Sequence, residues 1–292
     1  MDIVIALLPA LLWGCTPLWV HFLGGKPIQQ LIGTTYGALI VGIVIYLIKR
    51  PEITVTDFLW CLLGGACWSL GQLAQYRAYG KLSVSTTSPI TAGIQLVGVN
   101  VVGVLCFGSW ASPSAKVIGF SAVALIIIGV FISSRTGKKD QSAADKRTFI
   151  KNVIQLILGT GIGYTACSTL PRIPHAQGWV TFPPQSIGML LGAVLLSFCF
   201  KEYRQQKPLL SRDTFKNIFE GFNSGLGTFF YLVAMMLNGV STAFTLSQMT
   251  PVIATFGGLV ILHEHKRGKA LTCTLIGLVA IVIGGIMTSF IK

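Results

Sequence analysis

Amide, hydroxyl and aromatic side chains recur at helical spacing inside the apolar stretches of this chain. Trp68, Gln72 and Gln75 follow one another at intervals of three and four residues, which places them on one face of a helix. Thr91 and Gln95 repeat the spacing in the next stretch. Amides and hydroxyls both donate and accept hydrogen bonds, and aromatic rings offer flat apolar faces. This combination suits a neutral polyol such as a sugar.

The same residue types continue in later apolar stretches, at Gln185, Asn223, Tyr231, Thr245 and Gln248. A polar side chain that faces lipid is costly, so we expect these residues to face other helices or a wet cavity. Each has a structural alternative, because Gln, Ser and Thr also join membrane helices by hydrogen bonds.

Acidic residues bear on energy coupling, and all nine lie in loops or near the ends of apolar stretches. A proton-coupled carrier uses an ionisable group within the membrane. Glu264 is the first candidate and Glu220 the second, although the position of each favours a solvated charge at a helix end. His263 and His265 flank Glu264, but two ligands without a partner elsewhere make a weak metal site. We therefore expect no metal and no cofactor.

The composition is that of an integral membrane protein. The chain has 292 residues, of which 52% are hydrophobic and 11% are charged, and its mean hydropathy is +0.72. Soluble domains carry about 25% charged residues, so an ordinary soluble enzyme is excluded. The formal net charge of +13 lies in short loops, which predicts contact with the cytoplasm and anionic lipid rather than with nucleic acid.

Apolar stretches separated by charge, Pro or Gly predict an all-α membrane protein with ten transmembrane helices. Their expected limits are 3–21, 30–48, 57–76, 83–107, 116–134, 152–169, 184–200, 214–237, 241–262 and 270–290. Most of the 22 Lys and Arg residues lie in alternate loops. Because basic loops favour the cytoplasm, both termini are predicted outside the plasma membrane and the basic linker 135–151 inside.

Two parts of the sequence resemble each other. Residues 30–39 align with 185–194, and residues 57–86 align with 213–242, sharing an Asp and a Val-Ser-Thr triplet. This predicts two five-helix repeats, 1–134 and 152–292, joined by the linker 135–151. Five is odd, so the second repeat enters the membrane inverted, an architecture that supports alternating access. Gly33-x-x-x-Gly37 and Gly188-x-x-x-Gly192 predict close helix contacts at matching positions.

Two other functions fit the composition less well. An exporter of drugs or amino-acid-like metabolites could share the fold, but export of lipophilic cations calls for a carboxylate in the first helix, and residues 3–21 contain none. An integral membrane enzyme acting on sugar-linked lipid would need a carboxylate pair, a metal motif or an activated nucleophile, and no such cluster occurs.

Several segments together resemble the glucose/ribose uptake porters of the drug/metabolite transporter superfamily. They are IALLPALLWG, GGKPIQQLIGTTYGALIVG, WSLGQ, PITAGIQLVG, PPQSIGM, TLSQ and LHEHK. The resemblance implies sugar import in symport with protons by a 5+5 inverted repeat. The sequence itself leaves open symport or facilitated diffusion, glucose or ribose, and a monomer or a homodimer. The resemblance points to six residues on the substrate path: Trp13, Trp68, Gln72, Gln95, Gln185 and Gln248. The chain departs from the family pattern at Ser109, where Glu is common, and at Asn223, where Trp is common.

Overall fold

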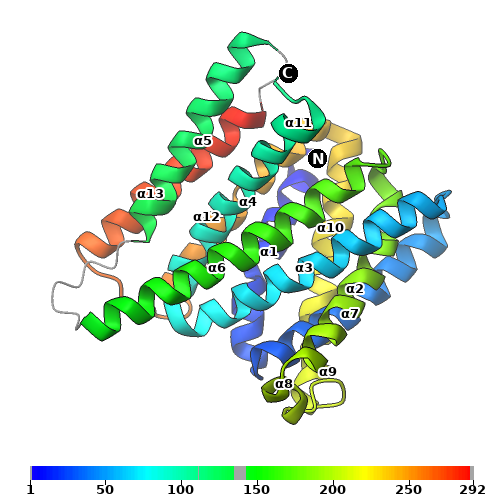
Figure 1. The fold of residues 1–292 in the computed structure, drawn as a ribbon, viewed down its shortest axis with the longest axis horizontal. Coiled ribbons are helices and arrows are strands. Elements are labelled where there is room, and N and C mark those ends of the chain that lie inside the picture. The colour runs from blue at the N-terminus through cyan, green and yellow to red at the C-terminus, as the bar shows by residue number, and fades with distance from the viewer. Residues whose placement is uncertain (1, 111, 135–142, 290–292) are drawn as a thin grey trace.

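The computed structural model describes residues 2–110, 112–134 and 143–289, and these residues form helices and connecting loops without a β-strand (Figure 1). Eight helical segments are long and apolar enough to cross a membrane. The chain is therefore an all-α, multi-pass membrane protein. The long helices are α1 (Asp2–Leu23), α2 (Pro27–Lys49), α3 (Val55–Leu82), α4 (Val84–Phe107), α5 (Pro113–Ser133), α6 (Ala143–Thr169), α7 (Phe182–Cys199), α10 (Ile218–Asn238), α12 (Thr250–Val260) and α13 (Lys269–Ser289).

Two of the predicted spans, α3 and α10, are not among the eight apolar segments. Both helices are long, but α3 carries Gln72, Gln75 and Arg77 and α10 carries Glu220 and Asn223. The polar residues that lower the hydropathy of these two helices are the ones with the chemistry of a binding site. Hydropathy alone therefore fails to identify these two helices, although they carry several of the candidate site residues.

Several helix limits differ from the sequence prediction. Helix α6 begins at Ala143, so residues 143–151 of the predicted linker form its first turns, while 135–142 lie outside the described residues. Two short helices, α8 (Lys201–Gln205) and α9 (Arg212–Lys216), lie between the predicted spans 184–200 and 214–237, and α9 includes the first residues of the second of these. The connection from α6 to α7 holds two 3-10 turns, η1 (Leu170–Arg172) and η2 (Gly178–Val180).

Two prolines within the predicted spans have different effects on their helices. The predicted ninth span is divided into α11 (Val240–Ser247) and α12, with Pro251 in the first turn of α12. Pro fits the first turn of a helix because the N–H it lacks has no partner there. Helix α4 instead continues through Pro89, which lies close to its N-terminus and removes one backbone donor without ending the helix.

The long helices other than α5 and α13 form a closed ring. Helix α1 packs against α10, α10 against α2, α2 against α7, α7 against α3, α3 against α6, α6 against α4, α4 against α12, and α12 against α1. Helices α5 and α13 pack on each other and on α4, at the left edge of Figure 1. The α1/α10 and α3/α6 interfaces therefore lie on opposite sides of the ring.

Helices from the two halves of the sequence alternate around this ring. Each helix pair in this ring joins a helix that ends before residue 134 to a helix that begins at residue 143 or later. The sequence halves are therefore interleaved rather than packed as two separate bundles. The helix contacts also correspond between the two halves of the sequence. Helix α3 packs on α6 and α7, and in the same way α10 packs on α1 and α2.

Unusual backbone conformations recur at the spacing of the sequence repeat. Three pairs share a positive φ: Arg50 and Lys207 at 41° and 44°, Ser83 and Gly239 at 81° and 80°, and Gly108 and His263 at 63° and 52°. The members of these pairs are separated by 157, 156 and 155 positions respectively, as their residue numbers show. The junctions between consecutive helices thus have matching geometry in the two parts of the chain.

The predicted close helix contacts at the paired glycines are confirmed. A Cβ at Gly37 would overlap the backbone of α10, and a Cβ at Gly188 would overlap the carbonyl oxygen of Leu62 in α3. At Gly192 it would lie 2.5 Å from the carbonyl oxygen of Ala66. Helix α2 therefore approaches α10 through its glycines, and α7 approaches α3 in the same way.

Candidate functional site

A tyrosine of α6 joins two glutamines of α3. The hydroxyl of Tyr164 lies 2.8 Å from Oε1 of Gln72 and 2.5 Å from Oε1 of Gln75. A phenol has only one proton, so it can donate to the amide oxygen of only one of the two glutamines. The other glutamine side chain is rotated by half a turn about its last bond, so that its NH₂ group donates to the phenol oxygen. The indole of Trp68 lies beside the same tyrosine, with ring centroids 6.4 Å apart. These residues form the α3/α6 cluster.

The Gln72 amide has one polar atom without a partner. Its side chain is only 6% exposed, and Nε2 makes no hydrogen bond to any described residue. Turning the amide exchanges Nε2 and Oε1, so either orientation leaves one atom unpaired. An unsatisfied buried polar group costs about 1–3 kcal/mol. A ligand hydroxyl that bonded to Gln72 would remove this cost.

A second cluster, the α1/α10 cluster, lies across the ring. Nε1 of Trp13 in α1 donates to the carbonyl oxygen of Ser224 in α10 at 3.1 Å. The Trp13 ring also contacts Tyr231, with centroids 5.6 Å apart. Gly227 makes room for the indole, since a Cβ at this position would lie 2.5 Å from Trp13 Nε1. Two predicted site residues from distant parts of the sequence are thus brought together.

Glu220 belongs to the α1/α10 cluster and is completely buried. Nδ2 of Asn223 donates to its Oε2 at 3.2 Å, and the Ser224 hydroxyl donates to its Oε1. No Lys, Arg or His among the described residues forms an ion pair with it. The alternative of a solvated helix-end charge is wrong for Glu220, because α10 begins inside the protein, against α1 and α2.

Helix α2 connects the start of α10 to α3. A Cβ at Gly221, the residue after Glu220, would overlap the carbonyl oxygen of Thr34 in α2. The Tyr76 hydroxyl lies 2.9 Å from the Thr34 hydroxyl of α2. The buried polar groups of α2, α3 and α10 are therefore close to one another at this level of the ring.

The remaining predicted residues make other contacts. Nε2 of Gln95 donates to the Ser168 hydroxyl at 3.4 Å, which places Gln95 at the α4/α6 interface. Nε2 of Gln185 donates to the Cys167 carbonyl oxygen at 3.0 Å and so ties α7 to α6. Gln248 is buried at the end of α11, bonds weakly to its own helix and lies against Gly285 of α13. Among the described residues, Gln248 makes no hydrogen bond to either cluster.

Asn223 also supports the packing of α1 on α10. Its Nδ2 donates to the carbonyl oxygen of Leu12 at 2.7 Å in addition to its bond to Glu220. Both N–H groups of this amide are thereby used within the protein. The residue positions the Glu220 carboxylate and leaves its own Oδ1 as the remaining polar atom.

Glu264 follows α12 and caps α4. Its carboxylate oxygens accept from the backbone N–H groups of Val84 at 2.5 Å and Ser85 at 3.0 Å. These N–H groups have no partner within α4, and the positive end of the helix dipole favours an anion there. The structure therefore gives Glu264 a defined role in holding the α12 end against the α4 start. No group of His, Cys, Asp or Glu in the described part of the chain has a metal-binding arrangement.

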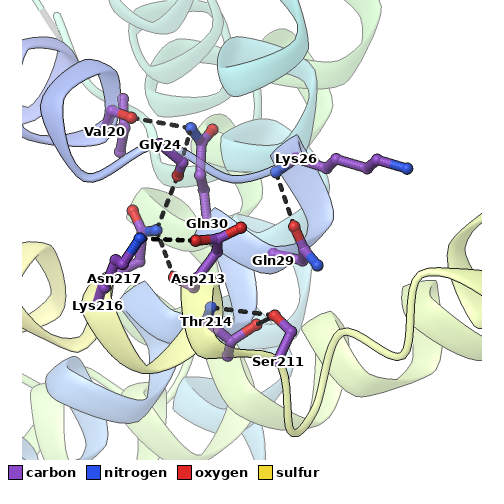
Figure 2. A network of polar contacts seen from close by, with 10 residues as sticks. All are labelled: Val20, Gly24, Lys26, Gln29, Gln30, Ser211, Asp213, Thr214, Lys216 and Asn217. Atoms are coloured by element: carbon purple, nitrogen blue, oxygen red, sulfur yellow. Dashed lines mark hydrogen bonds and ion pairs between the residues drawn. The ribbon is translucent and has the colours of Figure 1, made fainter.

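A polar network ties the loop before α2 to the start of α10 (Figure 2). Nε2 of Gln30 donates to the carbonyl oxygens of Val20 at 3.0 Å and Gly24 at 3.3 Å, and Asn217 donates to the same Gly24 oxygen at 3.0 Å. Asp213 pairs with Lys216 at 2.9 Å. Gln30 and its repeat counterpart Gln185 thus both bond to backbone of the preceding long helix.

Sequence reasoning missed Tyr164 and Ser224. Tyr164 lies in a Gly-rich segment whose glycines let α6 approach α3: a Cβ at Gly163 would lie 2.7 Å from the Cys67 carbonyl oxygen. An aromatic hydroxyl next to such a contact glycine was the available signal. Ser224 contributes through its backbone oxygen and a hydroxyl directed at Glu220, which side-chain type alone does not reveal.

A multi-pass helical membrane protein with polar clusters buried on opposite sides of a helix ring has the architecture of a solute transporter. Comparison with known proteins identifies which kind. The family model described as "Sugar transport protein" matches residues 4–291. The chain belongs to this family, whose members are transporters and not enzymes.

Individual relatives extend over the whole chain. The glucose uptake protein GlcU of Bacillus subtilis is 36% identical over 100% of this chain and 99% of its own length. RbsU of Latilactobacillus sakei, named after ribose uptake, is 38% identical over 100% and 99%. A protein of Listeria monocytogenes named after sugar uptake is 40% identical over 100% of both chains. One crystal structure, 15% identical, superposes with a TM-score of 0.52 over 98% of this chain and 95% of its own, which shows the fold alone.

Proposed function

We propose that the protein imports a neutral monosaccharide across the plasma membrane. Relatives that cover the whole chain are named after glucose, ribose and sugar uptake. The observation that carries the proposal to particular residues is the unpartnered amide atom of Gln72 beside Trp68. The amide would bond to a sugar hydroxyl, and the indole would contact the C–H face of the ring.

Residues of both clusters contribute to the proposed substrate path. Trp68 and Gln72 act from the α3/α6 side, and Trp13 and Tyr231 from the opposite α1/α10 side. Asn223 acts by orienting Glu220. The outer members of the path are Gln95, Gln185 and Gln248. Because their amides are bonded within the protein, they would reach the sugar in another conformation of the carrier.

Transport proceeds by alternating access in an inverted 5+5 repeat, in which α3 and α10 cross the membrane with the eight apolar spans. Support comes from the paired helix contacts and the recurring backbone conformations. Because the two sequence halves interleave, the moving units contain helices of both: α1, α2, α10 and α12 rock against α6, α7, α3 and α4. The seams are then the α2/α7 and α4/α12 contacts, with both termini outside and residues 135–151 in the cytoplasm.

Proton symport completes the proposal, with Glu220 as the coupling group. A buried carboxyl that has hydroxyl and amide donors but no cationic partner can bind and release a proton without breaking an ion pair. Glu264 is the other candidate, but its carboxylate already accepts two helix N–H bonds. The geometry therefore favours Glu220 over Glu264.

Counterflow of labelled glucose and ribose into proteoliposomes tests this function. We expect saturable counterflow of at least one sugar by the unmodified protein and a loss of about tenfold or more in apparent affinity in Gln72→Leu, which keeps the side-chain volume but removes the amide. Gln177→Leu is the matched control, because Gln177 is exposed and lies outside both clusters. Counterflow of no sugar by folded protein, or equal affinities in Gln72→Leu and Gln177→Leu, would reject the proposal.

A further inference from the structure

A groove separate from both clusters runs along the outside of α3. It has a volume of about 340 Å³ and is bounded by α3, α6 and the α7–α8 connection. One end is polar and basic, with Arg77 and Lys81 from α3 and Asn152 and Gln155 from α6. None of its lining residues is acidic.

The other end of the groove is apolar and open to the outside of the helix ring. Leu158 and Ile162 of α6 are 58% and 59% exposed. From Lys81 to Leu70 on α3 is eleven residues, or about 16 Å along a helix. In a membrane these side chains face lipid tails, so the groove joins a basic end to an apolar wall long enough to follow part of an acyl chain.

The two cations of the groove are not neutralised by the protein. Neither Arg77 nor Lys81 has an ion-pair partner in the part of the chain that the structure describes. Arg77 donates one N–H from Nη1 to the hydroxyl of Tyr203 at 3.0 Å. Burial raises the pKa of Tyr203, so its phenol remains neutral and leaves the guanidinium charge uncompensated. Four further N–H donors of Arg77 remain for a ligand.

The fold itself does not require these charges. At the repeat spacing of 156 residues, Arg77 and Lys81 correspond to Val233 and Leu237 of α10. The cytoplasmic side of the proposed topology carries further basic residues nearby, namely Lys151 on α6 and Lys201 and Arg204 around α8, against Glu202. Basic pockets between membrane helices on this side bind anionic lipid head groups.

We propose that this groove binds an anionic phospholipid, with the phosphate at Arg77 and Lys81 and an acyl chain along Leu158 and Ile162. The site is distinct from the sugar path and does not depend on it. A bound lipid would bridge α3, α6 and α8, which all belong to one of the two rocking units or its cytoplasmic extension. Anionic lipid would therefore act as a stabilising ligand of that unit.

Native mass spectrometry of the purified full-length protein, titrated with phosphatidylglycerol or phosphatidylcholine of equal chain length, tests the site. We expect phosphatidylglycerol to bind roughly tenfold or more tightly, and Arg77→Gln/Lys81→Gln to lose that preference, because each basic residue near anionic lipid contributes to affinity. Arg212→Gln/Arg267→Gln removes the same charge from exposed positions outside the groove and should keep the preference.

Two further arms make the result decisive. Lys81→Gln alone, whose side chain makes no hydrogen bond to a described residue, should lower the preference while leaving thermal unfolding in detergent unchanged. Glycerol 3-phosphate supplies the head group without acyl chains and should bind far more weakly than the lipid. Equal lipid preference in the groove and control variants, or equally tight binding of glycerol 3-phosphate, would overturn the proposal. The second result would assign the groove to a soluble phosphate ester.

Discussion

Ser83 and Gly239 have the same backbone conformation 156 positions apart, with φ and ψ of 81° and 157° at Ser83 and 80° and 160° at Gly239. Each residue is the single link between two helices, α3 and α4 in one case and α10 and α11 in the other. This region of φ and ψ is occupied almost only by glycine, because a Cβ is strained there by about 1–3 kcal/mol. The chain keeps this geometry in both places although only one of them has a glycine.

The strain at Ser83 predicts an unusual order of stability among variants. Ser83→Gly should unfold at a higher temperature than Ser83→Ala, because both variants lose the hydroxyl bond to Thr86 but only glycine, which has no Cβ, relieves the strain. The expected difference is about 1–2 kcal/mol. Thermal unfolding in detergent, followed by tryptophan fluorescence, measures it. Equal or reversed stabilities would show that the backbone at Ser83 is not strained.

Glycines at helix contacts and glycines elsewhere should respond oppositely to alanine. In Gly188→Ala the new Cβ would overlap the Leu62 carbonyl oxygen, so α7 and α3 must separate, at a cost of about 1–3 kcal/mol. Gly80→Ala adds a Cβ with no atom within 4 Å in the last turn of α3, which should stabilise by up to about 0.5–1 kcal/mol. The same unfolding measurement compares them. If Gly188→Ala were as stable as Gly80→Ala, or more stable, helices α7 and α3 would not be in close contact at Gly188.

The scaffold could be predicted well from the sequence because its signals are local. Apolar length identifies eight of the predicted spans, and paired Gly-x-x-x-Gly motifs identify the close contacts at Gly37 and Gly188. Helix ends were less accurate, since the charged start of α6 at residues 143–151 continues as helix beyond the apolar stretch. Charge predicts where a helix leaves the membrane better than where it ends.

The polar clusters could be predicted only in part, because they depend on contacts between distant helices. The spacing of Trp68 and Gln72 places them on one face, but that α6 supplies Tyr164 to this face is a tertiary fact. Glu220 lies at a helix start, which for an isolated helix means solvent. Only the packing of α10 against α1 and α2 buries it. Position within an element does not determine position within the protein.

A pH dependence of stability is expected from Lys266, which lies in the loop after α12. Burial lowers the pKa of Lys266 to about 8, and attraction to Glu264 offsets only part of this effect. The unfolded chain holds the proton up to its ordinary value of about 10.5. Between these values the unfolded state binds more protons, so the contribution of this group to stability rises with pH.

Lys266→Met should therefore be more stabilising near pH 7 than near pH 10. The methionine removes the cost of the buried ammonium, although it also loses the hydrogen bond from Nζ to Thr274 at 2.9 Å. The difference in unfolding temperature between variant and unmodified protein should shrink as the pH rises. Lys269→Met, at an exposed position, is the control and should show a constant difference. A constant difference at Lys266 as well would exclude a lowered pKa.

Glu220 and Glu264 should separate coupling from structure. In Glu220→Gln the side chain keeps its shape and can still bond to Ser224 and Asn223, but it cannot carry a proton. We expect sugar counterflow to persist while accumulation driven by an inward proton gradient is lost.

Glu264→Gln weakens the cap of α4, because a neutral amide offers one acceptor oxygen to the two N–H groups that the carboxylate binds. Glu264→Gln should lose about 1–2 kcal/mol of stability. Its ratio of proton-driven accumulation to counterflow should equal that of the unmodified protein. Accumulation and counterflow measured in the same proteoliposomes distinguish the two roles. If Glu264→Gln abolished accumulation while Glu220→Gln preserved it, the coupling group would be the helix cap and not the buried carboxyl of α10.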